Sequence, residues 1–226
     1  MALSTYTELK TAIANWLNRS DLTDEISDDF IKLVESEYNA KLRVKAMLNS
    51  KTDYSITGET VAVPTGFLQV RDFYITSGAE KYSLTYISPT QMDQVKGGST
   101  SGRPTVYTIL GDNFRFAPSP DATYTATINY YKAIDALSDS NTSNYILANH
   151  PGIYLYGSLY HAANFLGGIE PAKLQNWFQL YTTGMERVEI NDREDQWSGS
   201  PLKITSDVTV AAPFQTTNVG VVSNNE

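Results

Sequence analysis

The chain has 226 residues, of which 41% are hydrophobic and 19% are charged, and its formal net charge is −8 at pH 7. This length suffices for one well-cored domain, and the composition excludes a chain that is disordered throughout. The negative charge argues against DNA binding by the surface as a whole, although it does not exclude a locally basic ring. The absence of cysteine excludes disulfides, thiolate chemistry and cysteine-ligated zinc.

The sequence contains no recognisable targeting signal. The opening residues, MALSTYTELK, lack the basic start and apolar core of a secretion signal, and no apolar run approaches the ~20 residues that span a bilayer. We therefore expect a protein that is made and used in soluble form in a cytoplasm and does not contact a membrane.

Two helices are predicted near the start of the chain. Thr5 and Glu8 form a capping box, which begins a helix that ends near Asn18. Residues 27–29 (Ser-Asp-Asp) are expected to cap a second, longer helix, because acidic side chains suit the positive end of a helix. Its inward-facing residues would be Ile26, Phe30, Leu33, Val34, Tyr38 and Leu42. Its solvated face would carry Lys32, Glu35, Glu37 and Lys41.

From Lys51 onward the hydrophobic period changes from helical to alternating, which predicts an antiparallel β unit over about residues 51–132. A short helix that begins at Pro89 interrupts it, and Gly97 to Pro104 is expected to be the most flexible internal stretch. The predicted strands cover residues 52–56, 61–63, 67–75, 82–87, 104–110, 113–117 and 123–132.

A pair of helices is predicted after this unit. Pro151 suits a first helical turn, the Gly167–Gly168 pair supplies a left-handed residue that ends a helix, and Pro171 begins another helix that reaches about Ile190. So short a connection predicts an antiparallel hairpin. The first helix has apolar stripes of Leu155, Leu159, Ala162 and Leu166 and of Ile153, Tyr156, Tyr160 and Ala163, and the second has one of Leu174, Trp177, Phe178, Tyr181, Met185 and Val188.

The fold class that follows is α+β. An α-helical bundle would consist of an N-terminal helix pair, about residues 5–48, and the C-terminal hairpin, about residues 150–190, with the antiparallel β domain inserted between them. Residues 1–197 would form this body, and residues 198–226 an extended C-terminal arm. The arm carries almost no charge, and two interpretations stay open: a frayed terminus, or a segment that gains order on another subunit or partner. Its apolar residues, candidates for partner binding, are Val208, Val210, Phe214, Val219 and Val221.

Enzymatic motifs are scarce. The two histidines, His150 and His161, lack metal-ligand spacing; we expect His150 to serve as a helix cap and His161 as a core or interface residue. There is no GxSxG elbow, and GGSTSGRP lacks the ending of a phosphate-binding loop, so Arg103 is interpreted as a loop or inter-subunit contact. We expect no catalytic residue, no cofactor and no metal.

A series of short motifs, spread over about residues 3–190, occurs in a recognisable order. They are LRVKAM at 42–47, VAVPTGFL at 61–68, G-x-P-x-x-Y at 102–107, P-x-P at 118–120, Y-x-x-x-I-x-Y-Y at 124–131 and N-x-x-L-x-x-x-P-x-x-Y-L-Y at 144–156. With the helical opening, this order resembles the head-to-tail adaptor proteins of short-tailed and related bacteriophages. The arm over residues 198–226 matches no motif of that family.

The resemblance implies a structural virion protein, assembled in the host cytoplasm into a ring of usually twelve subunits. The ring would dock on the portal protein at the capsid vertex, hold the tail nozzle or tail tube below it, and leave a channel through which DNA passes without specific binding. Two alternatives stay open: a tail-tube, stopper or tail-completion protein of the same particle, and a hydrolase carried on the tail. The hydrolase would need a cleft with two placed carboxylates, for which the sequence offers no motif.

Overall fold

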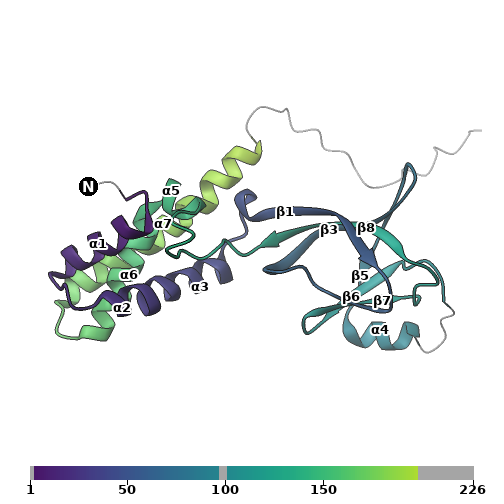
Figure 1. The fold of residues 1–226 in the computed structure, drawn as a ribbon, viewed down its shortest axis with the longest axis horizontal. Helices are drawn as coiled ribbons and strands as arrows, with labels where there is room; N and C mark the ends of the chain where they lie inside the picture. Colours follow the sequence, from purple (N-terminus) through teal and green to yellow (C-terminus); the bar gives the residue numbers. More distant parts are fainter. Residues whose placement is uncertain (1–2, 97–100, 198–226) are drawn as a thin grey trace, which may run out of the picture.

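The computed structural model describes residues 3–96 and 101–197, and it places a helical part and a β part end to end (Figure 1). The helical part is built from both ends of the described chain, and the β part from the residues between them. The α+β class predicted from the sequence is confirmed. The predicted arm over residues 198–226 lies outside the described residues.

The first helix, α1 (Tyr6–Leu17), begins and ends as its sequence dictates. The Thr5 hydroxyl accepts a hydrogen bond from the Glu8 N–H at 3.3 Å, and the Glu8 carboxylate accepts one from the Thr5 N–H at 3.1 Å. This reciprocal pair satisfies two donors that a helix start leaves without partners. The helix ends at Asn18, whose left-handed φ of 53° turns the chain away. The predicted capping box is confirmed.

The second helical segment differs from its prediction. It consists of α2 (Thr23–Glu25), a π-helical turn (Ile26–Phe30) and α3 (Ile31–Lys41). The predicted cap at residues 27–29 is wrong, because Ser27 lies inside the helix and its hydroxyl donates to the Thr23 carbonyl at 3.1 Å.

Two residues of α3 differ from the predicted pattern of burial. Leu33, predicted to face inward, is 47% exposed, and Glu35, predicted to be solvated, is only 5% exposed. The remaining inward-facing residues of the prediction are buried: Ile26, Phe30, Val34, Tyr38 and Leu42.

Two four-stranded sheets make up the β part. A 3-10 turn (Lys45–Met47) leads into the first sheet, whose strand order is β1-β8-β3-β4 and whose pairs are all antiparallel. These strands are β1 (Leu48–Ile56), β3 (Phe67–Ser77), β4 (Glu80–Ser83) and β8 (Tyr124–Lys132). The second sheet has the order β2-β7-β6-β5 and consists of β2 (Thr60–Ala62), β5 (Thr85–Tyr86), β6 (Val106–Leu110) and β7 (Asn113–Ala117).

The single strand predicted over residues 82–87 is wrong, since the chain passes from one sheet to the other within it. β4 pairs with β3 of the first sheet, whereas β5 pairs with β6 of the second, and this last pair is parallel. The β part is therefore mixed, and not antiparallel throughout as predicted. The sheets pack through aromatic rings: Phe73 of β3 lies 5.2 Å from Phe114 and 5.8 Å from Phe116 of β7, between ring centroids. Helix α4 (Pro89–Lys96) contacts β6 and β7.

Three helices follow β8. They are α5 (Tyr145–Asn149), α6 (Pro151–Leu166) and α7 (Pro171–Trp197). Gly167 and Gly168, with φ of 65° and 68°, reverse the chain between α6 and α7, as predicted. Helix α7 continues beyond the predicted end at Ile190, and Phe178, predicted to face inward, is 45% exposed.

Helix α6 lies at the centre of the helical part and contacts α1, α3, α5 and α7. Gly157 allows this close packing, because a Cβ atom there would lie 2.7 Å from Val34 of α3 and 3.0 Å from the ring of Tyr181 of α7. None of the helices within residues 3–96 and 101–197 is long and apolar enough to cross a membrane.

Side chains of α3 form hydrogen bonds with the backbone of the segment that connects β8 to α5. The Glu35 carboxylate accepts a hydrogen bond from the Leu137 N–H at 2.7 Å, and the Asn39 side-chain oxygen accepts one from the Ile134 N–H at 2.9 Å. The chain that returns from the β part is thereby held along the helical part.

Candidate functional site

The structure places one of the sequence-predicted site residues. Arg103 lies in the loop before β6, and its guanidinium stacks 3.5 Å from the centroid of the Tyr82 ring of β4. Such stacking fixes the side chain at the surface of the β part. Its role as an inter-subunit contact stays a prediction. The other candidates lie outside the described residues: Val208, Val210, Phe214, Val219 and Val221.

The histidines do not form a catalytic or metal site with each other. His150 is the N-cap residue of α6, as predicted, although its side chain makes no capping hydrogen bond. Its carbonyl accepts the Ile153 N–H at 3.0 Å, and burial lowers the pKa of its ring. His161 Nε2 lies 3.2 Å from a Glu37 carboxylate oxygen. No group of three or more potential metal ligands occurs in the part of the chain that the structure describes.

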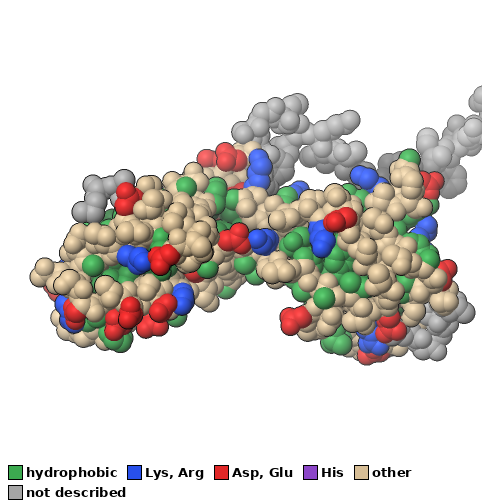
Figure 2. All heavy atoms as spheres, viewed as in Figure 1, with side chains coloured by type: hydrophobic (Ala, Val, Ile, Leu, Met, Phe, Trp, Pro, Cys, Tyr) green, Lys and Arg blue, Asp and Glu red, His purple; other side chains and the backbone are tan. Residues whose placement is uncertain are grey.

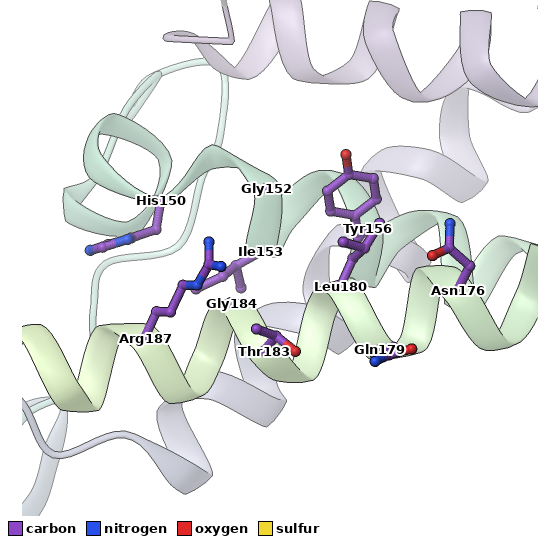
Figure 3. A pocket seen from close by; sticks show the side chains of 10 residues that line it. All are labelled: His150, Gly152, Ile153, Tyr156, Asn176, Gln179, Leu180, Thr183, Gly184 and Arg187. Atoms are coloured by element: carbon purple, nitrogen blue, oxygen red, sulfur yellow. The ribbon is translucent and has the colours of Figure 1, made fainter.

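A groove of about 480 Å³ lies between α6 and α7 (Figure 3). Gly152 and Gly184 contribute to it because they have no side chains to fill it. The ten side chains and glycines that line it are His150, Gly152, Ile153, Tyr156, Asn176, Gln179, Leu180, Thr183, Gly184 and Arg187.

Apolar side chains extend the groove onto the neighbouring surface. Leu180 of α7 is 40% exposed, and Tyr156 of α6 packs edge to face with Trp16 of α1, which is 49% exposed, at 5.9 Å between ring centroids. Arg187 is the charged residue among those labelled in Figure 3, and it extends from α7 toward α6 on the side of His150. We call Trp16, His150, Tyr156, Leu180 and Arg187 the groove surface.

Arg187 has no ion pair with any residue in the described ranges. A guanidinium stays charged at any pH that proteins experience, and it presents several donors in a planar fork. The groove therefore combines the apolar side chains of Ile153 and Leu180 with polar side chains and one positive group.

A second exposed apolar surface involves α3 and the end of α6. Phe165 is 59% exposed and Leu33 is 47% exposed, and both line a hollow of about 350 Å³ together with Asp29 and His161. The Phe165 ring packs against Phe30 at 5.6 Å between centroids.

This second surface is acidic. Asp28 is paired with Lys32 at 2.8 Å, whereas Asp29 beside it makes no ion pair within the described residues. Figure 2 shows acidic side chains gathered along the edge of the helical part on which α2 and α3 lie. The surface continues through the Tyr160 ring to the exposed Phe178. The centroid of the Tyr160 ring lies 5.5 Å from that of His161 and 5.0 Å from that of Phe178. We call Asp29, Leu33, His161, Phe165 and Phe178 the Phe165 surface.

The two surfaces lie on opposite sides of the α6–α7 hairpin. Tyr156 and Phe165 are nine residues apart on α6, which at about 100° per residue places them about 180° apart around the helix axis. Leu180 and Phe178 are two residues apart on α7, or about 200°. Exposed apolar patches with polar rims mark protein–protein contacts. The arrangement thus supports two unlike contacts.

Sequence reasoning missed both surfaces, and it assigned Leu33 and Phe178 of the Phe165 surface to the core. One signal was present: Phe165 and Leu180 belong to none of the apolar stripes predicted for their helices, and large apolar residues outside a buried stripe are exposed. Leu33 lies outside the stripe that α3 buries, which consists of Ile31, Val34, Glu35 and Tyr38.

The profile of a protein family described as SU10 adaptor protein matches residues 4–205 of the chain. No curated protein sequence matches it.

Proposed function

Because this chain belongs to the SU10 adaptor protein family, a family of phage head-to-tail adaptors, we propose that it forms a ring beneath the portal and joins the capsid to the tail. The ring would hold about twelve subunits, the number usual for such adaptors, and would leave a channel for DNA. The family is structural rather than enzymatic, and its members are components of the virion.

The family match over residues 4–205 is the observation that carries this proposal. Two features of the fold support it. The subunit is long, with its helical and β parts end to end (Figure 1), so one part can contact the head side while the other contacts the tail or a neighbouring subunit. The helical part also carries two unlike exposed surfaces, as a subunit in a closed ring requires.

The net charge of the chain supports the proposal that DNA passes through the ring. A net charge of −8 repels the phosphate backbone of DNA, so DNA would slide through the ring without being retained. The predicted arm over residues 198–226 would contact the portal or a neighbouring subunit, and the tail nozzle or tail tube would bind on the opposite side of the ring.

A complementation experiment tests the adaptor role. A phage with a nonsense mutation in this gene should produce DNA-filled heads and free tails that do not join, and adding the purified full-length chain should restore joined, infectious particles. Joined particles in the absence of the chain would contradict the proposal. Recovery of the chain on free tails of a portal-deficient mutant would favour a tail-tube, stopper or tail-completion protein instead.

A further inference from the structure

We propose that neighbouring copies of this chain bind each other by placing the Phe165 surface of one copy in the α6–α7 groove of the next, with Asp29 opposite Arg187. The inference rests on the proposed ring and names the surfaces that build it. The occupant of the groove is therefore a second copy of this chain.

The geometry of the helical part favours a head-to-tail contact. The groove surface and the Phe165 surface lie on opposite sides of the α6–α7 hairpin and contain different residues. A contact between two different surfaces leaves one surface free on each end of a pair, so each added copy presents a site for the next. Such contacts close into a ring when the rotation between neighbours divides a full turn, whereas a contact of a surface with itself stops at a dimer.

The charges favour contact between the groove surface and the Phe165 surface over contact of either surface with itself. A contact of the groove surface with itself would contain two Arg187 guanidinium groups, and a contact of the Phe165 surface with itself would contain two Asp29 carboxylates. Neither arrangement would give these groups a partner of opposite charge from the named residues of the two surfaces. The unlike arrangement joins a guanidinium to a carboxylate, a pair that can form two parallel hydrogen bonds.

The apolar residues of the two surfaces also favour contact between the Phe165 surface and the groove. Phe165 and Leu33 are 59% and 47% exposed beside a hollow of about 350 Å³, whereas the groove beside Leu180 and Tyr156 has the larger volume, about 480 Å³. Aromatic residues that enter a pocket and exclude water from it contribute much of the binding energy of protein interfaces. We therefore place the exposed Phe165 ring of one copy in the larger hollow, the groove, of the next copy.

Disulfide trapping tests this pairing directly, because the chain has no cysteine and every disulfide must join introduced residues. The full-length chain with both Phe165→Cys and Leu180→Cys is mixed with the portal protein of its phage and oxidised mildly. A denaturing gel should show a ladder of linked copies up to the size of the ring. Each single variant should remain monomeric on the gel. The matched control carries Leu110→Cys and Ile190→Cys, which are 56% and 49% exposed in the natural chain but lie off both surfaces, and should give no ladder.

The outcomes separate this inference from the adaptor role. A portal-bound oligomer, measured by its mass, without disulfides between the two introduced cysteines would overturn the pairing and leave the adaptor role standing. Dimers of the Leu180→Cys variant alone would show a groove-to-groove contact and would also overturn it. Failure of the natural chain to bind the portal would contradict both.

Charge exchange gives a second test. Arg187→Glu alone and Asp29→Arg alone should each weaken assembly on the portal by about tenfold or more, and both changes in one chain should restore it. Both side chains are exposed, so the monomer should fold in every variant. Arg193→Glu and Asp24→Arg are the matched controls, with the same changes of charge at exposed positions outside the two hollows, and should assemble normally. Failure of the double variant to recover, with folded monomers, would overturn the proposed pairing of Asp29 with Arg187.

Discussion

At the scale of single residues, Glu35 joins three segments that are distant in sequence. Its carboxylate accepts hydrogen bonds from the Leu137 N–H at 2.7 Å and from the Tyr154 hydroxyl at 3.0 Å. The Tyr154 oxygen in turn lies 2.8 Å from the Tyr38 hydroxyl and 2.6 Å from the Asn144 amide nitrogen. This network ties α3 to α6 and to the connection that returns from the β part, so it fixes the geometry of the helical part.

Burial raises the pKa of the Glu35 carboxyl above its usual 4.5, and the hydrogen bonds from Leu137 and Tyr154 and the charge of Lys32 oppose this shift only in part. A carboxyl with a raised pKa binds its proton more tightly in the folded state than in the unfolded state. Its contribution to stability is therefore full below pH 4.5 and is lost as the pH rises through the raised pKa.

Glu35→Gln should flatten this pH dependence. The glutamine oxygen can still accept from Leu137, but the side chain no longer titrates, so the free energy of unfolding should change less between pH 4.5 and 8 than in the natural chain. Glu35→Ala leaves the Leu137 N–H without its acceptor and should cost about 1–3 kcal/mol. Urea unfolding at a series of pH values measures both. If the free energy of unfolding of Glu35→Gln changed with pH as much as that of the natural chain, Glu35 would not be the source of this pH dependence.

At the scale of elements, the close approach of α6 to α3 and α7 depends on glycine. A Cβ atom at Gly157 would meet Val34 at 2.7 Å and the Tyr181 ring at 3.0 Å, and one at Gly184 would meet Ile153 at 3.1 Å. These distances are shorter than van der Waals contact, so a side chain at Gly157 would push the helices apart. Because α6 and α7 form the groove, their spacing also sets its width.

Gly157→Ala should therefore destabilise the chain by about 1–3 kcal/mol, the usual cost of overpacking a core. Gly152→Ala is the matched control in the same helix. Its Cβ would meet Tyr156 at 3.6 Å, an ordinary contact, and alanine should stabilise the helix by up to about 1 kcal/mol. Denaturant unfolding measures both changes. Equal stability of the two variants would show that the helices tolerate a wider spacing at Gly157.

The elements that local sequence controls were predicted well. Strand β7 over Asn113–Ala117 and the start of α1 match their predictions, because turn residues and the Thr5–Glu8 box act within a few positions of the chain. The elements that long-range packing controls were not. The π turn over Ile26–Phe30 and the parallel β5–β6 pair depend on partners far away in sequence, so neither leaves a local signal.

The candidate site was predicted less well than the fold. Sequence patterns indicated Arg103 and the arm residues, which stay predictions, and they placed Leu33 and Phe178 inside the core. A helical stripe shows which side of a helix is buried, but it does not show where the buried region ends. For Leu33 and Phe178 that boundary depends on the packing of α3, α6 and α7.

At the scale of the whole molecule, the subunit combines three properties that an adaptor needs. Its two parts lie end to end (Figure 1), its helical part has unlike surfaces on opposite sides, and its net charge of −8 disfavours retention of DNA. Formation of the ring is expected to depend on the portal, because ordering of chain segments in an assembly costs entropy that new interface must offset.

Native mass spectrometry of the purified full-length chain, alone and mixed with the portal protein of its phage, tests the central claim most directly. We predict a monomer alone and, in the mixture, a portal-bound ring of a fixed number of copies. Stable rings of the same size without the portal would contradict recruitment by the portal but not the adaptor role. Tubes that form from the chain alone, with no binding to the portal, would point to a tail protein. A chain that stays monomeric in both samples would contradict the adaptor role itself.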